Sequence, residues 1–289
     1  VVGVVMNVST VVGVVIFNKM IQTSHEYRHP VFMSAFHFFF TTIGTRVLLG
    51  MKFFEYKYCS PMAVLPVALG SLGSVAFNNL NLAHNSVGFY QISKLACIPA
   101  TLVIQWFMYG QSTSTATKLT LIPLLVGMWI TTVSDVEVNS AGLMYAVAAV
   151  SFTVFSQIFT SKYQKSLECD ALQLLYHTSP MIAVGMLCLC PMFDDIEGFL
   201  NFEYHTILIR DIIISCCFAL GVNVSNYLVL GKTGPLTYQV LGHLKTIMIL
   251  VLGFYFFGKS TSWTNILGIC IAMFGVVSYT EVKRRASEK

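Results

Sequence analysis

Charged residues are what this sequence has least of. Only 10% of its 289 residues are Asp, Glu, Lys or Arg, whereas a soluble domain carries about 25%. Mean hydropathy is +0.71, and long apolar runs fill most of the chain. The basic residues lie in short connections, so the net charge of +4 is no sign of nucleic-acid binding. The composition therefore excludes an ordinary soluble domain and predicts a polytopic membrane protein whose main partner is the lipid bilayer.

The sequence also lacks the patterns of an enzyme or a metal centre. Its eight cysteines have neither metal-ligand nor redox spacing, and most lie inside apolar runs. A nucleophile–base pair, an acidic dyad and a phosphate-binding glycine loop are all missing. We therefore expect a protein that is not an enzyme and needs neither cofactor nor metal.

Ten apolar runs predict ten transmembrane helices in an all-α membrane protein. The runs cover residues 1–22, 30–49, 62–83, 86–108, 119–133, 141–161, 172–192, 209–230, 235–257 and 263–282. With the C-terminus in the cytosol, the cytosolic connections hold Lys52, Lys57, Lys118, Lys162, Lys165, Lys232, Lys283, Arg284, Arg285 and Lys289, and the other side holds only Arg28, Arg210 and Lys259. This bias and the even helix count place both termini in the cytosol.

A repeat links the two halves of the chain. A shift of 148 residues without a gap matches Tyr90-Gln91 to Tyr238-Gln239, residues 112–114 (Ser-Thr-Ser) to 260–262, and Gly127 to Gly275. The shift equals five helices, an odd number, so matching helices run in opposite directions. We therefore predict two inverted five-helix repeats, 1–138 and 139–289, in one integral membrane domain. Such repeats are typical of secondary transporters with a site near the bilayer midplane.

Two lysines lie deep inside apolar runs. Lys94 falls about eight residues into the fourth run and Lys245 about ten into the ninth, which at about 1.5 Å per residue is near the midplane. A lysine there costs at least ~2.5–3.5 kcal/mol and usually meets an anionic partner. No Asp or Glu lies in the middle of any run. We infer that the partner is a transported anion; the alternative is that each lysine snorkels or bonds carbonyl groups.

Other polar groups accompany the lysines. Tyr90 shares a helical face with Lys94, and Tyr238 and Gly242 share one with Lys245. The tyrosines offer a stacking surface for a base or sugar, and Gly242 permits close approach. Four further side chains inside the runs are candidates to line the cavity, although helix–helix hydrogen bonding is the alternative for each. They are Asn79, His177, Asn223 and Gln239.

Residues 85–95 (NSVGFYQISKL) and 237–246 (TYQVLGHLKT) resemble the nucleotide-sugar transporters of the drug/metabolite transporter superfamily. The second stretch is similar to the Lys-Thr group, which includes plant Golgi UDP-rhamnose/UDP-galactose transporters and the E branch of solute carrier family 35. The resemblance covers essentially the whole chain. It implies ten helices, both ends cytosolic, and exchange of a cytosolic nucleotide sugar for a lumenal nucleoside monophosphate, and it leaves a homodimer open.

The sequence is also similar to plastid triose-phosphate/phosphate translocators. In those proteins, lysines matching Lys94 and Lys245 bind phosphate, and an arginine follows the second; here that residue is Thr246. A substrate-binding tyrosine of that family is replaced by Val222, although Asn223 still matches. These departures favour a Golgi UDP-sugar/UMP antiporter. The alternatives are a plastid-type organic phosphate/phosphate translocator and a membrane protein that transports nothing.

Overall fold

The structure is a computed structural model that describes residues 2–85, 90, 93–132, 140–245 and 263–287. Every regular element in these residues is a helix, and 7 helices are long and apolar enough to cross a membrane. The predicted class, an all-α membrane protein, is confirmed. The count of ten spanning helices and the inverted repeats stay predictions, because parts of the fourth, fifth and ninth runs lie outside the described residues.

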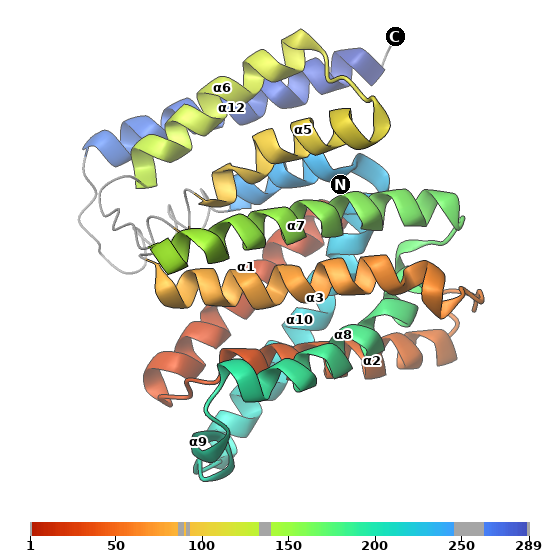
Figure 1. The fold of residues 1–289 in the computed structure, drawn as a ribbon, viewed down its shortest axis with the longest axis vertical. Helices are drawn as coiled ribbons and strands as arrows, with labels where there is room; N and C mark the ends of the chain where they lie inside the picture. Colours follow the sequence, from red (N-terminus) through yellow and green to blue (C-terminus); the bar gives the residue numbers. More distant parts are fainter. Residues whose placement is uncertain (1, 86–89, 91–92, 133–139, 246–262, 288–289) are drawn as a thin grey trace. The chain divides into compact units, whose positions relative to one another are not determined.

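The helices follow the apolar runs closely (Figure 1). They are α1 (Val2–Ser24), α2 (Pro30–Gly50), α3 (Pro61–His84), α5 (Cys97–Tyr109), α6 (Thr115–Thr132), α7 (Ser140–Ser166), α8 (Ala171–Phe193), α9 (Ile196–Leu200), α10 (Thr206–Thr233) and α12 (Trp263–Ser287). Residues 235–245 are also helical.

Local chemistry fixes several helix ends. Pro30 stands in the first turn of α2, where its missing N–H costs nothing. A capping box starts α8: the Asp170 carboxylate accepts from the Gln173 N–H at 2.8 Å, and the Gln173 side chain accepts from the Asp170 N–H at 2.9 Å. Gly234, at φ +81°, separates α10 from the helical residues 235–245.

The chain divides into two compact units. Unit 1 comprises Val1–Asn79 and Phe155–Gly234, and unit 2 comprises Leu80–Val154 and Pro235–Lys289. Helices α3 and α7 therefore each contribute to both units. Each unit takes residues from both predicted repeats, 1–138 and 139–289, so the units and the repeats are different divisions of the chain. The repeats are defined by which residues match in sequence, and the boundary between them stays a prediction.

In unit 1, α1 packs against α10, and α2 packs against both α8 and α10. Polar side chains cross the α1–α10 contact: the Asn7 amide donates to Ser225 at 2.8 Å and to Asn226 at 2.7 Å, and the Ser215 hydroxyl donates to Asn18 at 2.6 Å. Within a bilayer the hydrophobic effect does not drive helices together, so close packing and such hydrogen bonds stabilise the unit.

The connection between α8 and α10 lies at one end of unit 1. The short helix α9 lies in this connection, and Phe199 stacks on Phe32 with ring centroids 3.7 Å apart. Asp194 caps α2 from outside, because its carboxylate accepts from the Phe32 N–H at 2.7 Å. Burial raises the pKa of Asp194 above its ordinary value despite this bond.

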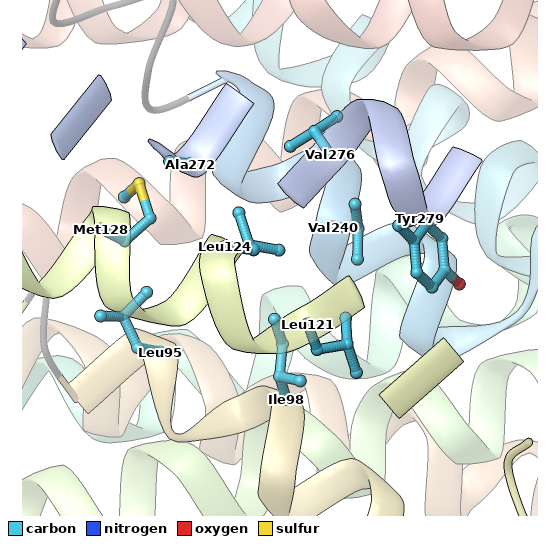
Figure 2. Packing of buried hydrophobic residues seen from close by; sticks show 9 residues of the cluster. All are labelled: Leu95, Ile98, Leu121, Leu124, Met128, Val240, Ala272, Val276 and Tyr279. Atoms are coloured by element: carbon cyan, nitrogen blue, oxygen red, sulfur yellow. The ribbon is translucent and has the colours of Figure 1, made fainter. Parts of the chain in front are cut away.

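In unit 2, α6 and α12 lie side by side (Figure 1). Their shared core takes Leu121, Leu124 and Met128 from α6 and Ala272, Val276 and Tyr279 from α12 (Figure 2). Leu95, just before α5, Ile98 of α5 and Val240 complete the cluster.

Glycine permits the close approach of α6 and α12. A Cβ on Gly127 would meet the backbone of Gly268 and Ala272, and a Cβ on Gly275 would meet the backbone of Leu124. These contacts make the two helices antiparallel. Gly127 and Gly275 are also partners under the shift of 148 residues. The matched glycines of the predicted repeat thus lie at one helix–helix contact.

Candidate functional site

The first predicted lysine lies just before α5. Residues 90 and 93–95 are helical, and Ala96 forms a turn before α5 begins at Cys97. The Lys94 ammonium lies 4.1 Å from the centroid of the Tyr90 ring. The Ser93 hydroxyl donates to the Tyr90 carbonyl at 2.7 Å and accepts from the Asn81 amide at 2.8 Å, which ties this segment to the end of α3. The backbone that carries Lys94 is therefore held to α3 through the adjacent Ser93.

The second lysine lies on the helical residues 235–245. The Lys245 ammonium lies 5.1 Å from the centroid of the Tyr238 ring, and the side chain is 8% exposed. This helix is fixed on two sides: the Gln239 amide donates to the Thr101 hydroxyl of α5 at 2.6 Å, and Thr237 and Tyr279 share a hydrogen bond of 2.8 Å between their hydroxyls. Gly242, on the face of Lys245, has no described atom within 4 Å of where a Cβ would stand.

The structure brings both lysines and both tyrosines into unit 2. The like charges of the two lysines repel each other, and His243 is also buried in this unit. None of the ion pairs among the described residues includes Lys94. The binding of an anion by these two lysines stays a prediction, and a bound anion would offset their repulsion.

The remaining predicted residues divide into three groups. Gln239 belongs to unit 2 but uses its amide to bond Thr101. Asn79, His177 and Asn223 belong to unit 1, where each has a partner: Asn79 reaches Ser34 at 3.5 Å, His177 donates to the Lys57 carbonyl at 2.8 Å, and Asn223 donates to Thr41 at 2.9 Å. Thr246 lies outside the described residues. The bonds of the unit 1 residues are of the kind expected from helix packing alone.

Sequence reasoning missed two features. Thr101, the partner of Gln239, is a single threonine in an apolar run, and no pattern distinguishes it. Asp211 is 1% exposed in α10, where it contacts Arg210 at 2.8 Å and His25 at 3.1 Å. The adjacent charges of Arg210 and Asp211 at the start of an apolar run were a signal that this carboxylate is buried and paired.

Comparison with known proteins identifies the family. The Triose-phosphate Transporter family matches residues 5–280, nearly the whole chain. The chain belongs to this family. It is 36% identical to UDP-xylose transporter 2 of Arabidopsis thaliana over 98% of this chain and 82% of that protein. It is 33% identical to UDP-rhamnose/UDP-galactose transporter 1 of the same plant, over 95% of this chain and 81% of that protein.

A solved crystal structure shares the fold, with a TM-score of 0.73 over 96% of this chain and 98% of that one at 11% identity. The family and its apolar helices establish a multi-pass membrane protein that is a transporter and not an enzyme.

Proposed function

We propose that this protein is a nucleotide-sugar antiporter that moves a UDP-sugar into the Golgi lumen in exchange for UMP by alternating access. The observation that carries the proposal is the pair of lysines, Lys94 and Lys245, which belong to the same compact unit. The names of its relatives, which are UDP-xylose and UDP-rhamnose/UDP-galactose transporters, support this substrate class.

The phosphates are the part of the substrate that the lysines recognise. A UDP-sugar carries two adjacent phosphates, whose negative charges offset the repulsion between two ammonium groups. The ammonium group binds phosphate as a compact point charge, which suits a bridging phosphate that offers no free terminal face. The cavity-lining role predicted for Asn79, His177 and Asn223 stays a prediction.

Thr246 separates this substrate from a small organic phosphate. An arginine after Lys245 would add a planar fork of donors that holds a terminal phosphate bidentately. A nucleotide sugar has no terminal phosphate, because the outer one bears the sugar. Threonine at this position keeps two lysines for the diphosphate and leaves volume for the sugar ring, which favours the UDP-sugar over triose phosphate.

Orientation and exchange complete the proposal. Ten basic residues on one side of the predicted helices against three on the other place both termini in the cytosol. UMP keeps the uridine and one phosphate, so it fits the same cations and serves as the exchanged product. The protein acts either alone or as a homodimer, since the proposed site needs only one chain.

Counterflow in proteoliposomes tests the function. Purified protein is reconstituted with UMP, inorganic phosphate or buffer inside, and uptake of radiolabelled UMP is measured. Stimulation by internal UMP, and competition by UDP-sugars from outside, is the expected result. Stimulation by phosphate alone would instead indicate an organic phosphate/phosphate translocator, and stimulation by neither would indicate a protein that does not exchange these anions. A thermal-shift panel of UDP-, GDP- and CMP-sugars then identifies the base.

A further inference from the structure

Each of the two site lysines lies over the ring of a tyrosine on its own helical segment. The Lys94 ammonium is 4.1 Å from the Tyr90 ring centroid, and the Lys245 ammonium is 5.1 Å from the Tyr238 ring centroid. Both distances fall within the roughly 6 Å over which a cation is attracted to the negative face of an aromatic ring. The ring faces that hold the ammonium groups are therefore not open to a nucleobase, which differs from the stacking role predicted for these tyrosines.

The repeat pairs the two tyrosines with each other but does not pair the two lysines. A shift of 148 residues places Tyr90 on Tyr238, but it places Lys94 on Gly242 and Cys97 on Lys245. The lysine thus lies four residues after the tyrosine in one segment and seven residues after it in the other. At about 100° per residue, both spacings bring the lysine back to the helical face of the tyrosine. The common element of the two segments is a ring beneath an ammonium group.

A ring face suits a cation that must later bind a ligand. A lysine carries its charge on a long flexible stem, and an ammonium held in one place binds an anion at a smaller entropic cost than a mobile one. A carboxylate would also hold it, but it would neutralise the charge. An aromatic ring orients the ammonium and leaves its full positive charge for the ligand.

We propose that Tyr90 and Tyr238 are positioning residues that hold Lys94 and Lys245 by cation–π contact in the orientation that binds the phosphates. The proposal rests on the function proposed above. It assigns the tyrosine rings to the lysines rather than to the base or sugar, and it predicts that the electron density of each ring sets the affinity for the anion.

A graded change of the ring tests this assignment. Phenylalanine and its 4-fluoro, 3,5-difluoro and 3,4,5-trifluoro derivatives are introduced at position 90 or 238, and the inhibition constant of UMP is measured in proteoliposomes. Each fluorine weakens the negative ring face with little change in size, so UMP should bind progressively more weakly, by about tenfold across the series. The control is the same series at Tyr279, whose hydroxyl contacts Thr237 in the same unit. There the inhibition constant of UMP should not change from phenylalanine to its trifluoro derivative.

A second measurement does not depend on transport. The lysine amines are methylated with ¹³C reagents, and the signals of Lys94 and Lys245 are assigned with Lys→Arg variants. An ammonium over a ring gives an upfield ring-current shift, which Tyr90→Phe should keep and Tyr90→Leu should remove; Tyr238→Phe and Tyr238→Leu should do the same for Lys245.

The outcomes separate the two proposals. A missing ring-current shift, a flat fluorination series, or tighter UMP binding with added fluorine overturns the positioning role while the transport function stands. If the wild-type protein exchanges no UMP, the proposed function fails, and the positioning of the lysines for that substrate fails with it; the ring-current shift then reports only whether the rings hold the ammonium groups.

Discussion

His25, the residue after α1, contacts Asp211 of α10 with 3.1 Å between its Nε2 and the carboxylate. The carboxylate is 1% exposed and also contacts the Arg210 guanidinium at 2.8 Å. His205 lies 3.0 Å from the other ring nitrogen of His25. Asp211 therefore joins the residue after α1 to the start of α10, two helices that pack against each other in unit 1.

We predict that Asp211→Ala destabilises the protein by about 2 kcal/mol, because it removes charged hydrogen bonds and leaves the Nε2 of the largely buried His25 without this partner. Asp211→Asn should lose less, since its amide oxygen still accepts one bond. Melting temperatures in detergent rank the variants, with Glu197→Ala, an exposed position in α9, as the control for a lost acidic side chain. Equal melting of Asp211→Ala and the wild type would show that the contact contributes nothing.

The pH dependence of stability should report on Asp194. Burial raises the pKa of this carboxyl, so the folded protein binds its proton more readily than the unfolded chain does. Stability from this group is therefore fully present below the unfolded pKa and is lost as pH rises through the folded pKa. Relative to Asp194→Asn, whose amide oxygen can still accept from Phe32, the wild type should gain melting temperature between pH 7 and pH 4.5.

The comparison needs a control for the loss of a charge from this connection, and Asp195→Asn at the exposed neighbouring position supplies it. A melting temperature of the wild type minus that of Asp194→Asn that stays constant across the pH range, or that becomes lower as the pH falls, would contradict the environment described for Asp194.

The glycines between α6 and α12 should resist substitution. Gly127→Ala or Gly275→Ala places a methyl group against the backbone of the partner helix, which cannot move aside without separating the pair. We expect each to cost about 1–3 kcal/mol, as overpacking does. Gly50→Ala, where a Cβ would meet nothing within 4 Å, is the matched control and should leave the melting temperature unchanged or slightly higher. If both glycine variants melt at the wild-type temperature, α6 and α12 lie farther apart than in the structure.

The sequence predicted the membrane class and the helices because both depend on local composition. Apolar runs correspond to α1, α2, α8 and α10 within a few residues, and the repeat pairs Gly127 with Gly275, which both lie where α6 and α12 pack together. The division into units could not be read in this way. It depends on α3 and α7 contributing to both units, which is a matter of tertiary packing and not of hydropathy.

The two lysines of the candidate site could be predicted because charged residues are rare inside apolar runs. Lys94 and Lys245 stand out in apolar runs, and the structure places them in one unit. The partners of the neutral polar residues were not predictable. Asn223 bonds Thr41 across 182 positions and Gln239 bonds Thr101 across 138, and no local pattern specifies such distant pairs. The pairing of Asp211 with His25 was missed for the same reason, since 186 positions separate them.

The central claim is that Lys94 and Lys245 bind the transported anion. The most direct measurement is UMP counterflow by Lys94→Ala and Lys245→Ala in proteoliposomes, beside Lys118→Ala, which removes an exposed lysine of the same unit. Melting temperatures verify that all three variants fold. Loss of exchange in both site variants with full exchange in Lys118→Ala is the predicted result. Exchange at the wild-type rate by either folded site variant would show that its lysine does not bind the substrate.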